Sequence, residues 1–229
     1  PRQAIAQLPL FLARAFGVEL CFSTPVHAID LPHIYTPSTT WHVERAVVCS
    51  GVDFESLYPD LYAASGLTRC KLQMMRTAPQ DNDWQLGPML AAGLTLRHYA
   101  AFKRCAALAD YAARVSRENP EFDQWGIHVM ASQNGLGEIT IGDSHEYDWH
   151  PDPFDKPHID RLILDYLQRF LAAPSLDIVQ RWSGTYAKHP TRADIVASPA
   201  PNVRIVNGVG GAGMTTSFGL AEEVFTDWT

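Results

Sequence analysis

The clearest chemical signature in the sequence is a group of glycines near the C-terminus. Gly208, Gly210 and Gly213 form G-x-G-x-x-G between the predicted strand 202–206 and a predicted helix. Glycine lets a backbone approach a ligand, and free N–H groups at a helix start attract electronegative oxygens. A dinucleotide fingerprint also needs a further strand with an acidic residue about 20 positions on. Only sixteen residues follow Gly213, so no NAD-binding unit is completed. The pattern predicts backbone contact with a ligand or, alternatively, a turn that only packs the helix.

Two other places carry side chains suited to chemistry. Asp143–His150 is rich in nitrogen and oxygen ligands, but alternate side chains of a strand face opposite sides. His145 and Glu146 therefore do not share an ion, a strand-end loop explains the run, and we expect no metal site. Arg97 can clamp a carboxylate or phosphonate through two parallel hydrogen bonds. A surface arginine is the alternative.

The spacing of apolar residues and the positions of glycine and proline predict the helices and strands that must position these groups. The first part of the chain predicts a helix followed by small-residue strands, typical of a mostly parallel α/β sheet. The second part predicts long strands, a hairpin and two amphipathic helices. The expected helices are 2–16, 100–117 and 158–172, and the expected strands are 18–22, 26–29, 41–43, 45–50, 70–77, 126–131, 138–141 and 177–181. We expect 18–22, 47–50 and 203–206 to share one sheet.

Composition excludes several classes of protein. Hydrophobic residues make up 46 % and charged residues 19 %, as in a globular chain. The net charge is −7 without a basic run, which excludes a nucleic-acid or anionic-membrane footprint. No apolar run approaches the roughly 18 residues of a membrane span. The four cysteines form no C-x-x-C pair, which favours reduced thiols and a cytoplasmic location.

Three segments carry a family resemblance. They are VNGVGGAGMTTSFGLAEEVF at 206–225, RAVVCSG at 45–51 and RCKLQMMRT at 69–77. Together they resemble flavin-dependent oxidoreductases of the D-amino-acid oxidase, glycine oxidase and sarcosine oxidase superfamily. The resemblance implies FAD as cofactor, with the glycine segment against the flavin ring and the helix start near its pyrimidine end. The cofactor-binding residues it implies are Gly51, Gly208, Gly210, Gly211, Gly213, Met214 and Thr215.

The resemblance also implies which residues lie near the substrate. Tyr186 falls where the family places an aromatic or basic residue over the flavin, although a core or interface tyrosine is the alternative. His145 stands near a strand end from which a family histidine reaches the substrate pocket; a structural histidine is equally compatible. Gly184 stands where some sarcosine oxidases attach FAD through cysteine, so we expect non-covalent FAD. Lys188 and His189 are interpreted as solvent-facing.

Two features refine the expectation about activity. Thr215 stands where monomeric sarcosine oxidases have a lysine thought to promote reaction with oxygen, which leaves a dehydrogenase open. The tail and GEITIGDSHEYD at 137–148 resemble a branch linked to bacterial aminophosphonate breakdown.

One departure shapes the expected architecture. The family's pyrophosphate-binding βαβ unit is not in this sequence, so we interpret the chain as roughly the C-terminal two thirds of a flavoenzyme. The predicted class is α/β plus α+β, with the remainder of an FAD-binding Rossmann-like layer at 1–66 and 186–229. A mixed, largely antiparallel substrate-domain sheet flanked by helices is expected at 67–185.

The resulting functional hypothesis is an enzyme. The intact protein would oxidise a small primary or secondary amine, of amino-acid or aminophosphonate type, to an imine by hydride transfer to flavin. The 229 residues alone would be inactive. The alternative is a non-catalytic binding or regulatory domain derived from the same fold. The sequence leaves the substrate, the electron acceptor and the oligomeric state open.

Overall fold

The computed structural model describes residues 2–81, 83–226 and 228. Pro1, where the first expected domain begins, lies outside the described residues. The helices are α1 (Arg2–Phe16), α2 (Pro59–Ser65), α3 (Leu94–His98), α4 (Ala107–Glu118), α5 (Pro120–Gln124), α6 (Pro157–Leu167) and α7 (Gly213–Thr226), with the 3₁₀ turns η1 (Ala100–Arg104) and η2 (Gly210–Ala212). Among the described helices, none combines the length and apolar character needed to cross a bilayer.

The strands form three sheets. A small antiparallel sheet has the order β1-β2-β3, a larger sheet runs β10-β5-β8-β7-β6 with β9 also paired to β5, and a third sheet has the order β11-β12-β4. The strands are β1 (Ala28–Asp30), β2 (His33–Tyr35), β3 (Thr40–His42), β4 (Ala46–Val48), β5 (Thr68–Pro79), β6 (Leu90–Ala91), β7 (Met130–Gln133), β8 (Glu138–Gly142), β9 (Glu146–Asp148), β10 (Ile178–Lys188), β11 (Ile195–Ala200) and β12 (Val203–Asn207).

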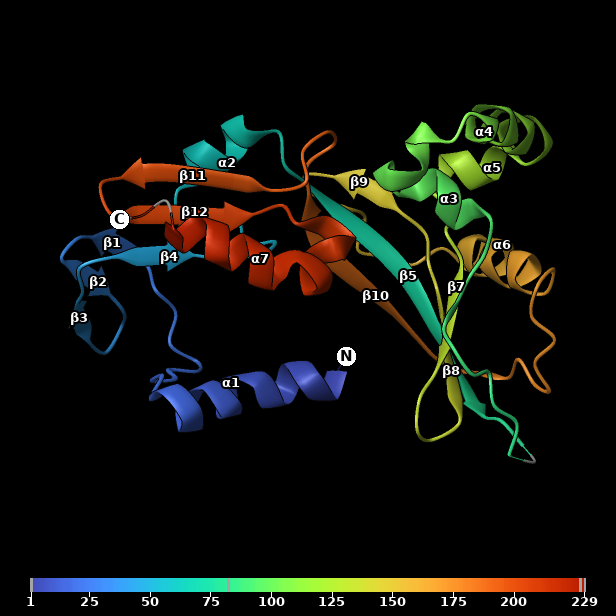
Figure 1. The fold of residues 1–229 in the computed structure, drawn as a ribbon, viewed down its shortest axis with the longest axis horizontal. Coiled ribbons are helices and arrows are strands. Elements are labelled where there is room, and N and C mark those ends of the chain that lie inside the picture. The colour runs from blue at the N-terminus through green and yellow to red at the C-terminus, as the bar shows by residue number, and fades with distance from the viewer. Residues whose placement is uncertain (1, 82, 227, 229) are drawn as a thin grey trace.

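The third sheet joins distant parts of the sequence. β12 pairs with β4 in parallel, with Val203 opposite Ala46 and Ile205 opposite Val48. Small and β-branched residues on these strands are buried because helices and loops cover them. In Figure 1, α7 crosses this sheet, and Arg204 of β12 donates a hydrogen bond to the carbonyl of Val224 in α7. The expectation that 47–50 and 203–206 share one sheet is therefore confirmed.

The larger sheet carries the second core. β5 pairs antiparallel with β10, β8 and β9, so one long strand organises the whole sheet. Ile159, Ile163 and Leu167 of α6 are fully buried in the core that this sheet shares with α4 and α5. The predicted class, α/β plus α+β, is confirmed, and β5 and β10 run together from one region to the other (Figure 1). The domain limits stay a prediction.

Four sequence predictions about local structure are wrong. Residues 18–22 form no strand, because Gly17 turns the chain at φ +68° and the alternating apolar residues find no partner strand among the described residues. The strand expected at 126–131 begins only at Met130, since Gly126 turns at φ +53°. The helix expected at 100–117 is broken by extended backbone at Cys105, and the one expected at 158–172 ends at Leu167.

Candidate functional site

The glycine-rich turn is held at its start by Asn207, the last residue of β12. The Asn207 amide nitrogen donates to the Gly51 carbonyl at 2.8 Å and to the Tyr62 hydroxyl at 3.3 Å. Its oxygen accepts the Gly208 N–H at 2.7 Å. Asn207 is 5 % exposed, so these bonds form away from water. The ends of β4 and β12 are thereby tied together, which places Gly51 beside the turn.

Steric surroundings separate the glycines of the turn into two kinds. A Cβ at Gly208 would lie 2.7 Å from Leu67 Cδ2, and one at Gly213 would lie 2.8 Å from Val209 Cγ2. These two glycines are required by packing. Gly210 is required by its φ of +57°. At Gly211 the backbone has no such φ, and a Cβ would find only the Tyr186 hydroxyl, at 3.9 Å. The fold itself does not explain why residue 211 lacks a side chain.

A groove of about 800 Å³ lies along this turn. Gly208, Gly210 and Gly211 line it, with Thr215 from the first turn of α7. Met214 also belongs to that helix start, and its side chain is exposed. The opposite wall comes from the segment after β10 and from the end of α3; it includes Lys188, His189, His98 and Tyr99. Lys188 and His189 are half-buried and line the groove, and that they face solvent stays a prediction. An isolated antiparallel bridge joins Lys188 to Val209, and both residues line the groove.

Tyr186 lies on β10, under the turn. Its ring carbon Cε2 and its hydroxyl are the groups that side chains at Gly210 and Gly211 would meet, at 3.8 and 3.9 Å. On β5 its partner is Cys70, which also pairs with Tyr147 of β9. Burial, and then the proximity of Cys70, raises the pKa of the Tyr186 hydroxyl, so Tyr186 stays protonated. Burial likewise raises the pKa of the Cys70 thiol to about 11.

Tyr147 lines a smaller cavity of about 190 Å³. Arg97, His98, His128 and His145 line it. The Arg97 guanidinium forms an ion pair with Asp123. His145 is buried, and its Nδ1 donates to the Gly126 carbonyl at 2.9 Å.

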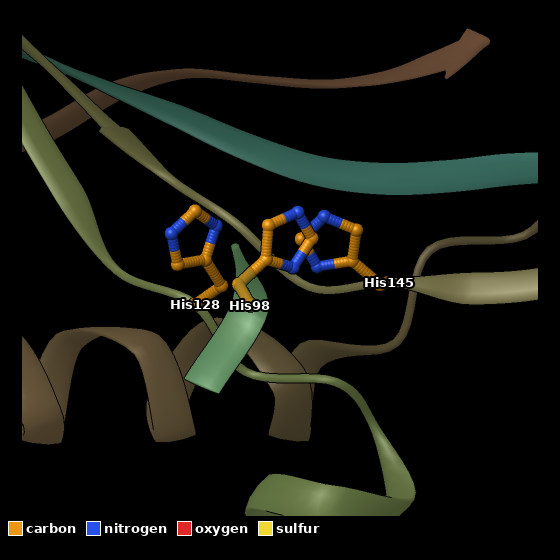
Figure 2. Close-up of side chains that lie close together, drawn as sticks. All are labelled: His98, His128 and His145. Carbon is orange, nitrogen blue, oxygen red and sulfur yellow. The ribbon is translucent and has the colours of Figure 1, made fainter. Parts of the chain in front are cut away.

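The three histidine rings of this cavity lie against one another (Figure 2). His98 is in the middle, with its ring centroid 4.4 Å from that of His128 and 4.5 Å from that of His145. Burial, followed by the two neighbouring histidines, lowers the pKa of His98 to about 3. Burial also lowers the pKa of His145, although Asp143 opposes the shift. At neutral pH both rings are therefore uncharged.

The predicted substrate residues fall into two places. Arg97 and His145 line the small cavity, whereas Tyr186 contacts the glycine turn. Tyr147 connects them, because its ring stacks on His145 at 6.1 Å and its strand position pairs with Cys70. Sequence reasoning missed His98, His128 and Tyr147. His98 directly follows Arg97, which was the one available signal; His128 sits in an apolar run that gives none.

Comparison with known proteins identifies the family. A family model described as FAD dependent oxidoreductase (DAO) matches residues 5–226. The chain belongs to this family of FAD-dependent flavoproteins. No curated protein matches the chain.

Solved structures of this family's fold resemble the chain. L-proline dehydrogenase from P. horikoshii matches with a TM-score of 0.62 and 17 % identity over 90 % of this chain and 49 % of its own. Glycine oxidase from Geobacillus kaustophilus has a TM-score of 0.58, 12 % identity and coverages of 90 % and 48 %. L-amino acid deaminase from Proteus vulgaris matches with a TM-score of 0.53 and 15 % identity over 90 % of this chain and 45 % of its own. These likenesses show the fold, and the chain spans about half the length of the structures it matches.

The residues of the turn fit the flavin that the family implies. Gly210 and Gly211 leave a strip of backbone open to the groove, and a Cβ at 211 would fill space that no described residue occupies within 3.9 Å. The first N–H groups of α7 add donors beside it, where a helix start favours negative charge. Thus the groove fits a planar ring system with electronegative oxygens.

Proposed function

We propose that this chain forms the flavin-ring and substrate side of an FAD-dependent oxidoreductase that oxidises a small primary or secondary amine. The observation that carries the proposal is Gly211, whose missing side chain the fold does not require and whose open space faces the groove beside Tyr186. Family membership supplies FAD as the cofactor class. The names of the similar structures, which include proline, glycine and L-amino acid, support an amino-acid substrate, and the sequence resemblance adds an aminophosphonate as the second candidate.

Each part of the proposed site has a defined task. Gly51, Gly208, Gly210, Gly211 and Gly213 keep the backbone close to the cofactor, with Met214 and Thr215 offering N–H groups at the helix start. Gly184 provides no thiol on this side, so the cofactor is held without a covalent bond. FAD, when bound, supplies the acceptor for the hydride that the amine loses as it becomes an imine.

The chain's own side chains bind and orient the substrate. Tyr186 keeps its proton and acts as a hydrogen-bond donor. Arg97 shares its guanidinium between Asp123 and the acid group of the substrate, since the fork presents several N–H groups. His145 donates through Nδ1 to Gly126, which fixes its ring in the wall of the small cavity. The small cavity thus selects an amine that also carries an acidic group.

The sequence carries the G-x-G-x-x-G pattern at one place, 208–213. We assign this turn to the flavin ring because it lines the larger groove beside Tyr186. We therefore propose that the 229 residues alone bind FAD weakly and do not turn over substrate. A cytoplasmic location accompanies this proposal, because all four cysteines are free thiols.

The test uses protein produced from the complete reading frame. We expect stoichiometric flavin absorbance after gel filtration, and anaerobic bleaching by amino acids or aminophosphonates. Gly211→Val should weaken FAD binding or slow bleaching by at least about tenfold, because the new side chain fills the cofactor's space. Thr215→Val is the matched control, since it lies on the same wall and keeps its N–H.

Two outcomes decide against the proposal. Wild-type FAD binding and bleaching in Gly211→Val would remove the turn from the flavin site. A complete protein that binds no flavin would favour the non-catalytic binding module instead.

A further inference from the structure

Three histidines from separate parts of the chain converge in the small cavity. His98 ends α3, His128 lies just before β7, and His145 lies just before β9. One ring nitrogen from each can be chosen so that all three lie within 4.8 Å of one another. Figure 2 shows the rings gathered at one point, although they come from elements far apart in the sequence.

The cavity also holds polar atoms that the described residues leave unpaired. Neither ring nitrogen of His128 has a hydrogen-bond partner there, and His128 is only 3 % exposed. Asp143 Oδ1 is unpaired by the same criterion and lies 3.3 Å from His128 Nδ1. Buried polar groups are nearly always satisfied. Unpaired lone pairs from imidazole and carboxylate together are the donor set of a transition-metal ion.

The surroundings of His145 resemble the supporting shell of a metal ligand. Its Nδ1 donates to the Gly126 carbonyl, which fixes the ring and leaves Nε2 free. A metal-bound histidine commonly donates its second nitrogen to a carbonyl in this way. A Cβ at Gly126 would lie 2.8 Å from His145 Cβ, so the backbone there holds the histidine tightly.

We propose that His98, His128 and His145 bind one divalent transition-metal ion of the zinc type, with Asp143 or water as a fourth ligand. Zinc takes imidazole nitrogens at about 2.0–2.1 Å in a tetrahedral arrangement. The nitrogens must therefore move to about 3.4 Å apart, and the stacked rings must turn edge-on. The ion enters through the groove, because half-buried His98 lines both the groove and the small cavity.

This site revises the sequence prediction that the region binds no metal. That prediction considered only Asp143–His150, where neighbouring side chains face apart. The structure instead joins His145 to histidines outside that run. The inference does not rest on the proposed amine oxidation, because metal binding is measured without flavin or substrate.

The test is a metal titration of the full 229-residue chain after chelator treatment. We expect one Zn²⁺ per chain in competition with a chromophoric chelator, with a Kd at or below about 1 μM. Co²⁺ in the same site should give the strong visible absorption of a tetrahedral complex. The melting temperature should rise with Zn²⁺ concentration, because the ion binds the folded state.

Variants distinguish this site from surface binding. His98→Gln and His128→Leu should each weaken Zn²⁺ binding at least about tenfold, with circular dichroism confirming the fold. His98→Gln is the safer variant, since its side chain is only half-buried. The matched control is His42→Gln, because His33 and His42 form a close surface pair with ring centroids 5.6 Å apart.

Zn²⁺ binding by the cavity variants and by the His42→Gln control decides between the cavity and the surface. Stoichiometric binding that survives His42→Gln and is lost in His98→Gln supports the proposal. Binding that is lost only in His42→Gln, that is unchanged in both cavity variants, or that requires millimolar Zn²⁺ overturns it.

Discussion

Tyr186, Cys70 and Tyr147 connect the glycine turn with the histidine cavity, yet these two regions are built in opposite ways. At the turn, the buried Asn207 amide uses both its nitrogen and its oxygen in hydrogen bonds to the chain. In the cavity, both ring nitrogens of His128 lack partners among the described residues. At the turn, residues of the chain satisfy the hydrogen bonds of the Asn207 amide, and the groove beside the turn leaves space for a ligand. The cavity leaves polar atoms unpaired and requires a ligand to satisfy them.

The largest expected effect is the slow reaction of the Cys70 thiol on β5. Cys70 is 0 % exposed, and its pKa is raised to about 11, whereas Cys21 and Cys105 are exposed. At pH 8 only about 0.1 % of such a thiol is the reactive thiolate. We expect Cys70 to react with a disulfide reagent at least about a hundredfold more slowly than Cys21 and Cys105, as followed by peptide mapping. Equal labelling of all three would show that water reaches β5 at Cys70.

Because the Asn207 amide is hydrogen-bonded and the His128 ring is not, we expect substitutions at these two residues to change the free energy of unfolding by different amounts. Asn207→Leu leaves the buried Gly208 N–H without its acceptor and should lower the free energy of unfolding by about 3 kcal/mol. His128→Leu removes two unpaired nitrogens and should change it by less than about 1 kcal/mol in metal-free protein. Urea denaturation of both variants measures the difference. A larger loss in His128→Leu would mean that the cavity is as fully paired as the turn.

The glycines sharpen the comparison within the turn itself. Gly208→Ala should cost about 2 kcal/mol, since it combines a φ of +73° with a contact of 2.7 Å to Leu67. Gly211→Ala should change stability by less than about 0.5 kcal/mol, because its Cβ meets only the Tyr186 hydroxyl at 3.9 Å. Thermal denaturation of the pair measures this smallest effect. Should Gly211→Ala destabilise as much as Gly208→Ala, packing would explain both glycines, and the argument for an open cofactor strip would fail.

The sequence by itself determined the features that depend on neighbours along the chain. The strand–turn–helix at 203–226 follows from local apolar periods and glycines, so its prediction was confirmed. That 47–50 and 203–206 share one sheet was also predicted, and the structure shows that β4 and β12 pair in parallel. The strand expected at 18–22 failed for the converse reason. Alternation of apolar residues does not form a strand unless another strand supplies hydrogen-bond partners.

Only the tertiary structure decided which side chains meet. Tyr186 came under the glycine turn because the β10–β5 ladder extends to Lys188, well beyond the predicted strand at 177–181. His98, His128 and His145 converge because α3 and the segments before β7 and β9 end at one cavity. No local period encodes such a meeting, since it depends on sheet register and on the packing of separate elements. The turn was therefore readable from the sequence, whereas the histidine cavity was not.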